Sequence, residues 1–404
     1  MSAFSAAGLE TLERRLASHC GDHTVPGLVG LVARNGESHV ICRGVREWSG
    51  AAVNRDTIFR IASMSKPITA AATLALADEG LLDLHAPIEQ WIPELANRRV
   101  LRSIDAPVTD TVAAKRSITA HDCLTFTFGY GYLGTAEGDP LPVQLAEAAL
   151  QLGQGPPQPN ASVDAEEWIR QFATLPLMYQ PGERWLYNTG ALVLSVLVQR
   201  ASGQPFDAFV KERVLEPLGM HDTSFWVPED KLDRFTTAYS PDFAGQRQGP
   251  VVYDDARAGQ WTSRPRFPKG DSGLVSTVED FARFASMLAN GGELGGARVL
   301  STSAVEAMTT DHLTTEQKAV SGLVDGYFDT HGFGYGVTVV TAAGLPEGRP
   351  AAYGWDGGLG SVWRNDPTTG MTAVLLTNMA WDRPIPPQVF VDFFTAAYEA
   401  VGDG

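Results

Sequence analysis

The sequence predicts an α+β fold in which one central antiparallel sheet is built from both ends of the chain, with helices in between. Apolar runs typical of strands occur near the N-terminus and again after about residue 270, whereas the middle is rich in loops and helix formers. The 404 residues also exceed what one hydrophobic core usually fills. We therefore expect one domain, 1–404, with an α/β subdomain formed by 1–80 and 270–404 and a mainly helical subdomain formed by 81–269.

Near the N-terminus, the sequence predicts a helix followed by a β-hairpin. Leucines recur at helical spacing within 9–16, with charged residues between them, which is typical of an amphipathic helix. The apolar run 27–33 is an expected strand, and 38–45 is its expected partner. Asn35-Gly36 lies between them and is a strong signal for a hairpin turn.

The rest of the chain carries further helix and strand signals. After Ser63 the composition changes to Ala, Leu and Thr, and Gly80 stands where a glycine would end a helix. The other expected helices are 165–173, 191–201 and 389–401, and the expected C-terminal strands are 334–340, 361–364 and 371–376. We expect the strands from both ends of the chain to share one sheet.

Composition excludes several classes of partner. The formal net charge of −16 argues against nucleic acids and anionic membranes, because both are bound by clustered Lys and Arg. No run of about 18 or more apolar residues occurs, so no membrane span is expected. Cys20, Cys42 and Cys123 lack metal-like spacing, which favours free thiols and a cytoplasmic protein. The histidines show no H-E-x-x-H or paired spacing either, so no metal is predicted. No cofactor is expected, and the oligomeric state stays open.

Ser63 and Lys66 form an S-x-x-K motif at an expected helix start. Residues three apart on a helix share a face, so the lysine amine can reach the serine hydroxyl. A serine becomes nucleophilic when a base takes its proton, and a lysine can be that base in a desolvated site. The alternative is that Ser63 only caps the helix while Lys66 faces solvent. Ser65 is a less suitable nucleophile, because adjacent helical residues do not face each other.

Several segments in order resemble the serine β-lactamase and penicillin-binding-protein superfamily. They are IFRIASMSKPITAAATLALADEGLLDLHAPI, LTFTFGYG, PGERWLYNTGALVLSVLVQRASGQPF, LEPLGMHDTSF and GLVSTVEDFARFASMLANGG. The resemblance covers most of the chain. The subgroups it resembles most are the class C β-lactamases and the family VIII carboxylesterases, which are similar to them. It implies a β-lactamase-like fold in which S-x-x-K opens the central helix and Ser63 carries the acyl group.

The resemblance also implies a role for Tyr187. In this family a tyrosine, usually in Y-x-N, shares proton transfer with the lysine, and Trp185-Leu186-Tyr187 supplies it here. Taken alone, Tyr187 could be a core aromatic at a helix start. Thr189 occupies the family's asparagine position and Asn188 comes one residue early. This departure weakens the amide contact that β-lactamases make, and Asn188 is the residue we expect to bind substrate.

The third family element is a strand motif, K-T-G in β-lactamases, to which Trp355-Asp356-Gly357 aligns as W-x-G. The family lysine helps to bind a lactam carboxylate, so Trp355 in its place favours an esterase and is an expected substrate-binding residue. Trp355 could also be ordinary core packing. Gly357 lacks a Cβ and would let the backbone approach the substrate. By family position, the amides of Gly358 and Ser63 form the oxyanion hole.

Three other patterns are interpreted as structural. The sequence GDSG at 270–273 is similar to the surroundings of a trypsin-like serine, but it leads into an expected capping box at Ser276 and Glu279, so we interpret it as a loop and a helix cap. GFGYG at 332–336 precedes a strand-like run instead of a helix, which argues against a dinucleotide site. His331 could line the cleft, although such a histidine is more often structural.

The predicted function is hydrolysis of small-molecule carboxylic esters through an acyl-enzyme on Ser63, with Lys66 and Tyr187 as general base and acid. A β-lactamase, a D-amino-peptidase or other amide hydrolase, and an acyltransferase could use the same three residues. A non-catalytic binding relative is the alternative from another class, and the presence of all three residues argues against it. Loops around 130–165 and 235–270 are expected to shape the pocket and so to decide the substrate.

Overall fold

The computed structural model describes residues 3–21, 24–133, 144, 148, 157–161, 163–242, 249–383 and 385–401. Parts of the two loops that were expected to shape the pocket therefore lie outside the described residues. No helix in these ranges combines the length and the apolar character needed to cross a bilayer.

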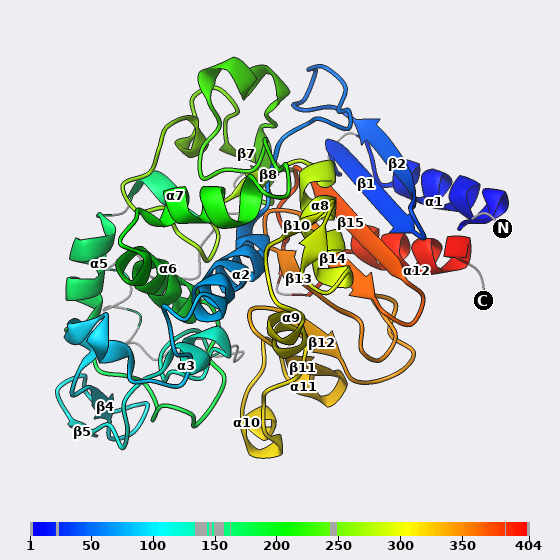
Figure 1. Cartoon of the computed structure of the whole chain (residues 1–404). Helices are drawn as coiled ribbons and strands as arrows, with labels where there is room; N and C mark the ends of the chain where they lie inside the picture. Colours follow the sequence, from blue (N-terminus) through cyan, green and yellow to red (C-terminus); the bar gives the residue numbers. More distant parts are fainter. Residues whose placement is uncertain are drawn as a thin grey trace.

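A seven-stranded antiparallel sheet joins the two ends of the chain (Figure 1), with the strand order β11-β12-β13-β14-β15-β1-β2. Its strands are β1 (Gly27–Arg34), β2 (Glu37–Gly44), β11 (His331–Phe333), β12 (Thr338–Val340), β13 (Tyr353–Gly357), β14 (Ser361–Asp366) and β15 (Met371–Thr377). β1 pairs with β15, with Leu31 opposite Val374. This pairing confirms the predicted central sheet built from N- and C-terminal segments.

Helices cover both faces of this sheet. On one face, α1 (Ala6–Ser18) and α12 (Gln388–Val401) lie side by side and bury an apolar layer that includes Leu12 and Phe393. On the other face, α8 (Val278–Ala289) packs against β1, β14 and β15. A central strand covered on both faces has no side that faces solvent, and every residue of β15 is accordingly buried.

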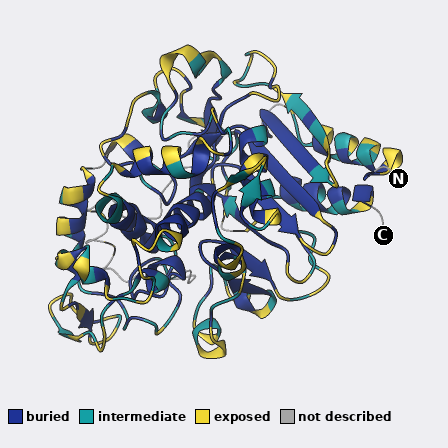
Figure 2. Cartoon of the chain, viewed as in Figure 1, coloured by how far each residue is buried: buried dark blue, intermediate teal, exposed yellow. Residues whose placement is uncertain are grey.

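A group of helices lies beside the sheet, with α2 at its centre. Its members are α2 (Ser65–Asp78), α3 (Ala120–Leu124), α5 (Ala165–Phe172), α6 (Thr189–Ser202) and α7 (Phe206–Val210). Helix α2 contacts α6 and α7, and every residue from Ser65 to Leu76 is buried (Figure 2). A helix buried on all sides has a fixed position, so it is a rigid base for residues at its N-terminus. The predicted subdomain boundaries at 80 and 270 stay a prediction.

Short elements complete the described chain. The two-stranded pairs are β3 (Phe59–Arg60) with β8 (Val275–Ser276), β4 (Arg99–Leu101) with β5 (Thr111–Ala113), β6 (Ala238–Ser240) with β7 (Val251–Asp254), and β9 (Glu293–Leu294) with β10 (Ala297–Arg298). The remaining helices are α9 (Thr302–Met308), α10 (Thr315–Ala319), α11 (Tyr327–Thr330), the 3-10 helices η1 (Ala62–Met64), η2 (Ile88–Gln90), η3 (Pro93–Leu95), η4 (Pro159–Ala161), η6 (Glu229–Arg234) and η7 (Gln260–Thr262), and the π-helix η5 (Lys211–Leu215).

The turn signals in the sequence are confirmed. Asn35 and Gly36 have φ of 51° and 79°, as the predicted two-residue hairpin between β1 and β2 requires. Gly80 follows the end of α2 with φ of 72°, and Gly203 closes α6 with φ of 70°. Left-handed backbone is strained for residues with a Cβ, which explains glycine at both helix ends.

Two local predictions are wrong. The segment 334–340 is not one strand: Gly334 donates its N–H to the carbonyl of Val337, and only Thr338–Val340 pairs as β12. The helix cap lies one residue beyond the predicted Ser276, at Thr277, whose hydroxyl accepts from the N–H of Asp280. The Ser276 hydroxyl instead lies 2.8 Å from that of Thr223.

Candidate active site

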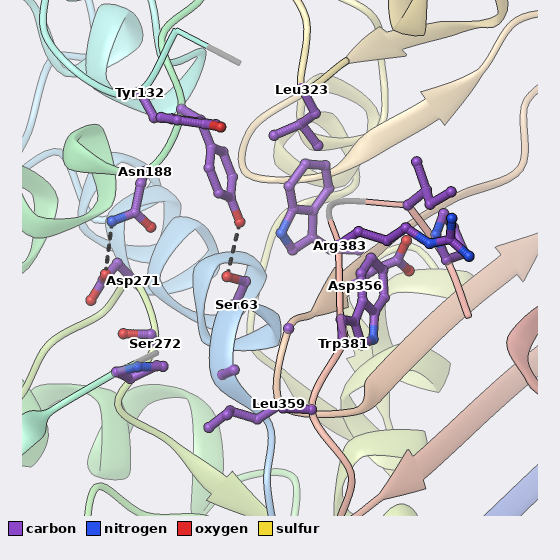
Figure 3. Close-up of a pocket in the computed structure, with 18 of the residues that line it drawn as sticks. Ser63, Tyr132, Asn188, Asp271, Ser272, Leu323, Asp356, Leu359, Trp381 and Arg383 are labelled. Atoms are coloured by element: carbon purple, nitrogen blue, oxygen red, sulfur yellow. Dashed lines mark hydrogen bonds between the residues drawn. The ribbon is translucent and has the colours of Figure 1, made fainter. Parts of the chain in front are cut away.

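A cavity of about 720 Å3 lies where η1, the start of α6, the 270–273 loop and the end of β13 meet (Figure 3). Ser63, Tyr187 and Asn188 line it, as do Trp355 and Gly358. Five of the seven residues predicted for the site from the sequence thus face one cavity. The other two, Lys66 and Gly357, lie directly behind its wall.

Ser63 lies in the short 3-10 helix η1, which precedes α2. The preceding Ala62 has φ of 43°, a left-handed conformation that is strained for a residue with a Cβ. The surrounding structure holds this turn from two sides. The N–H of Ile61 donates to the carbonyl of Leu274, and the hydroxyl of Ser361 donates to the carbonyl of Ile61. The turn therefore presents Ser63 to the cavity in a fixed orientation. Ser63 does not cap α2, because the N-cap is Met64 and makes no side-chain cap bond.

Lys66 is 1% exposed and its amine reaches the serine directly. The Nζ of Lys66 donates to the Oγ of Ser63 at 2.9 Å and to the backbone carbonyl of Asp271 at 2.7 Å. It also lies 4.6 Å from the centre of the Tyr187 ring. The alternative that this lysine faces solvent is therefore wrong. Its amine has polar partners on two sides, as a buried lysine requires.

Tyr187 lies two residues before α6 and approaches the serine from the other side. Its hydroxyl donates to the Oγ of Ser63 at 2.9 Å. Its backbone pairs with Tyr132, and the N–H of Leu186 donates to the carbonyl of Phe126. The ring packs on that of Trp355, with centroids 5.7 Å apart. The structure thus brings one serine, one lysine and one tyrosine together from segments more than 120 positions apart.

The β13 residues occupy three different environments. Trp355 is 3% exposed and belongs to an aromatic cluster with Phe333, yet it also lines the cavity, so it is both core and wall. Gly358 is exposed at the cavity, and a Cβ there would meet open space. Gly357 is buried instead: a Cβ on it would lie 2.3 Å from the carbonyl oxygen of Ile61. The missing side chain at Gly357 therefore allows β13 to pack against the Ser63 turn, whereas the substrate approach that we expected there stays a prediction.

Asn188 lines the cavity, and its side chain is engaged with the protein. Its Nδ2 donates to the Oδ2 of Asp271 at 3.0 Å (Figure 3). Asn188 is the N-cap of α6 but makes no side-chain cap bond, and its φ of 79° and ψ of −60° are unusual for a residue other than glycine. The predicted contact between Asn188 and a substrate is therefore limited to the part of the amide that Asp271 leaves free.

The GDSG segment belongs to the site, and our interpretation of it as a simple loop missed this. Asp271, Ser272 and Gly273 line the cavity, and Asp271 contacts both Lys66 and Asn188. The Gly-Asp-Ser-Gly pattern is visible in the sequence. Nothing in the sequence indicated that it would lie beside the S-x-x-K motif, about 200 positions away.

A second group of polar side chains lines the cavity on its β11 side. The ring of His331 stacks on that of Tyr327, and its Nε2 lies 3.2 Å from the Oε1 of Glu347. The Arg364 guanidinium forms a two-bond ion pair with the Asp356 carboxylate. Burial opposes ionisation of Glu347, but the hydrogen bond from His331 and the charge of Arg364 lower its pKa overall. His331 therefore lines the cleft within a structural polar network.

Lys269 also lines the cavity, beside the Asp271 loop. Burial lowers the pKa of the Lys269 amine, and the nearby Asp271 carboxylate opposes this shift. Among the described residues, no group of three or more His, Cys, Asp or Glu side chains could hold a metal ion. The chemistry that these side chains can perform is proton transfer to and from a serine hydroxyl.

Comparisons with known proteins show the family and the fold. A family model described as Beta-lactamase matches residues 11–382. Protein Rv1367c of Mycobacterium tuberculosis is 38% identical over 333 residues, covering 81% of this chain and 79% of that protein. Esterase EstB of Burkholderia gladioli is 31% identical over 373 residues, covering 88% and 86%. The solved structure of EstCE1, described as a hydrolase with promiscuous acyltransferase activity, has a TM-score of 0.77 at 22% identity, covers 98% of this chain and 100% of its own, and shares the fold.

Proposed function

The chain belongs to the β-lactamase family and is a hydrolase of that family, and we propose that it is a serine carboxylesterase acting through an acyl-enzyme on Ser63. One observation carries the proposal. The Oγ of Ser63 lies 2.9 Å from the Nζ of Lys66 and 2.9 Å from the hydroxyl of Tyr187, at the wall of a cavity large enough for a small-molecule ester. Both distances are within the reach that proton transfer needs.

In the acylation step, the Oγ of Ser63 attacks the ester carbonyl while its proton passes to the Lys66 and Tyr187 pair. The negative charge that develops on the carbonyl oxygen faces the amides of Ser63 and Gly358. Each such donor contributes about 10²–10³ in rate. The pair then returns the proton to the departing alcohol, so the alcohol leaves neutral and the acyl group stays on Ser63.

Water completes the cycle by attacking the acyl-enzyme, with the same pair as base. The acid is released and the serine hydroxyl is restored. Lys66 and Tyr187 both contact Ser63, so either can accept the proton of water, and one of them must be deprotonated for each step. No metal or organic cofactor takes part in this sequence.

Two features support an ester as the substrate. Trp355 takes the position where β-lactamases have a lysine for the lactam carboxylate, and it is buried against Tyr187 and Phe333. EstB, an esterase, is similar over 88% of this chain. The negative net charge supports a small-molecule substrate over a nucleic acid.

A panel of p-nitrophenyl esters, nitrocefin and D-amino-acid amides tests the proposal, together with labelling by a fluorophosphonate. We expect the wild type to label at Ser63 and to turn over short acyl esters with a kcat/KM well above that for nitrocefin or the amides. Nitrocefin hydrolysis as efficient as ester hydrolysis would replace the esterase proposal with a β-lactamase. Protein that neither labels nor turns over esters would contradict catalysis and favour a binding relative. Addition of a primary alcohol, with analysis of the new ester formed, measures acyl transfer.

A further inference from the structure

We propose that Asp271 is a positioning residue for the esterase reaction, holding Lys66 through its backbone and Tyr187 through Asn188. This inference rests on the proposed function, because it assigns a role within that reaction. Asp271 is 7% exposed, lines the cavity and contacts both Lys66 and Asn188, the residue that follows Tyr187 in the chain.

The contacts form a closed ring around the serine. Lys66 donates to the Oγ of Ser63 at 2.9 Å and to the Asp271 carbonyl at 2.7 Å. Asn188 donates to the Oδ2 of Asp271 at 3.0 Å, and Asn188 is bonded to Tyr187 through the chain. Tyr187 closes the ring with its 2.9 Å bond to the same Oγ. The two dashed bonds in Figure 3 are the Tyr187–Ser63 and Asn188–Asp271 links of this ring.

The Asp271 loop is hydrogen-bonded to both α2 and α6. On the α2 side, the hydroxyl of Thr69 donates to the carbonyl of Gly270, and the N–H of Leu274 donates to the hydroxyl of Ser65. On the α6 side, the N–H of Gly270 donates to the hydroxyl of Ser195. A Cβ on Gly270 would lie 2.4 Å from the Oγ1 of Thr69 and 2.6 Å from the Oγ of Ser195. The loop therefore packs closely against both helices, and the position of Asp271 relative to α2 and α6 is fixed.

The backbone of Asn188 shows why a side-chain bond is needed at this position. Its φ of 79° is disfavoured for a residue other than glycine, and an asparagine at an N-cap ordinarily accepts a hydrogen bond from the next turn. Asn188 makes no such cap bond and gives its amide to Asp271 instead. The Asp271 carboxylate thus holds the backbone in the conformation that directs the Tyr187 hydroxyl to Ser63.

The second carboxylate oxygen of Asp271 allows the role of the hydrogen bond to be tested separately from that of the charge. The Oδ1 of Asp271 is buried and accepts no hydrogen bond from any residue that the structure describes. The positioning role accordingly depends on one acceptor, Oδ2, and not on the full charge. An asparagine at this position keeps an amide oxygen as acceptor for Asn188, whereas an alanine removes it. The backbone carbonyl that binds Lys66 is present in all three proteins.

The experiment compares wild type with Asp271→Ala, Asp271→Asn, Asn188→Gly and the Asp271→Ala/Asn188→Gly double variant on a p-nitrophenyl ester. We expect Asp271→Ala to lower kcat by about 10²-fold with KM changed less than about threefold, because a misplaced catalytic group costs rate and not substrate affinity. Asp271→Asn should stay within about fivefold of wild type. Asn188→Gly removes the bond to Asp271 without adding backbone strain, and it should lower kcat in the same direction as Asp271→Ala, because the freer glycine no longer holds Tyr187 in one orientation.

The double variant decides whether the two side chains act through each other. Its kcat should match the lower of the two single variants and not their product. Equal kcat in wild type and Asp271→Ala would overturn the positioning role. So would an Asp271→Asn variant as slow as Asp271→Ala, or a double variant whose loss of kcat is the product of the two single losses.

Thermal unfolding of each variant shows which are folded, and Asp271→Asn and Asn188→Gly keep the test valid if the alanine variant does not fold. Wild type and Ser63→Ala in the same assay separate the two claims: an inactive wild type contradicts the proposed function, and an active wild type with an unaffected Asp271→Ala contradicts only the positioning role.

Discussion

At the scale of single residues, two donors meet on one oxygen. Lys66 and Tyr187 both direct hydrogen atoms at the Oγ of Ser63 when the amine is charged and the phenol is neutral. In that protonation state neither neighbour can take the serine proton. In the proposed reaction, attack by Ser63 therefore requires that the pair as a whole holds one proton fewer.

The two serines of the motif can be told apart by matched substitutions. Ser63→Ala removes the nucleophile and should lower kcat by several orders of magnitude. Ser65 is 0% exposed and its hydroxyl accepts from the N–H of Leu274, so Ser65→Ala should keep turnover within a fewfold of wild type. It should lower the free energy of unfolding by about 1–3 kcal/mol, because a buried N–H loses its acceptor. Ester kinetics and chemical denaturation measure both effects; loss of turnover in Ser65→Ala with retention in Ser63→Ala would reverse the assignment.

Tyr187→Phe removes one hydroxyl and leaves the ring in place. The ring contacts with Trp355 and Phe126 should persist, so folding is expected to be unaffected. We expect kcat to fall by about 10³-fold or more, because members of a catalytic unit are lost together. Tyr327→Phe is the matched control: Tyr327 lines the same cavity, but its hydroxyl donates to Thr338 at 3.0 Å. A near-normal kcat in Tyr187→Phe would remove Tyr187 from the mechanism.

At the scale of elements, turns and helix ends were predicted well from the sequence, and contacts between distant segments of the chain were not. The Asn35-Gly36 hairpin and the glycines that end α2 and α6 follow from backbone sterics, which depend only on neighbouring residues. The segment 334–340 alternates like a strand, but Gly336 has φ of 70° and its N–H donates to the carbonyl of Leu124, so tertiary contact decided its conformation. Asp271 was missed for the same reason, since its role depends on partners far away in the sequence.

A histidine at the contact between α3 and the turn before β12 makes the free energy of unfolding depend on pH. The ring of His121 lies 5.0 Å from that of His85 and 5.4 Å from that of His312, and its Nδ1 is 2.9 Å from the hydroxyl of Tyr335. Burial and the charge of His312 lower the pKa of His121 from 6.5 to about 4, and the nearby Asp122 opposes this shift. Between these two pH values, the unfolded chain binds a proton at His121 that the folded chain does not. The free energy of unfolding must therefore fall as pH decreases from 6.5 to 4.

His121→Gln removes this titration and keeps a polar side chain opposite Tyr335. Denaturation at pH 7, 5.5 and 4 should show a smaller loss of stability in the variant, by about 1 kcal/mol, since solvent around the partly exposed ring weakens the effect. The same acid-dependent loss in wild type and His121→Gln would show that other groups cause it.

At the scale of the whole molecule, the site forms where the sheet meets the helices. The Ser63 turn packs under β13, with Ser361 bonded to Ile61 across 300 positions, while Lys66 and Tyr187 come from the helical side. Sequence periodicity alone could not place these segments together, because it describes one element at a time. The ordered family segments could, since they carry the arrangement of the whole fold. That is why the fold and the serine–lysine–tyrosine set were predicted, while Asp271 and the packing role of Gly357 were not.

The α12 layer is expected to stabilise the fold without positioning the Ser63 site, and substitutions of Phe393 test this. Phe393 is 0% exposed in the layer between α12 and the sheet, on the face opposite α8, and it does not line the cavity. Phe393→Ala should lower the free energy of unfolding by about 3–5 kcal/mol through the cavity it creates, and Phe393→Leu should lower it by less. Because the Ser63 ring of contacts is held by α2, α6 and the 270–273 loop, kcat per folded molecule should stay within about twofold in both variants. Denaturation midpoints and active-site titration with a fluorophosphonate give the two quantities independently. A kcat that falls in step with stability would mean that the α12 layer positions the site as well as supporting the sheet.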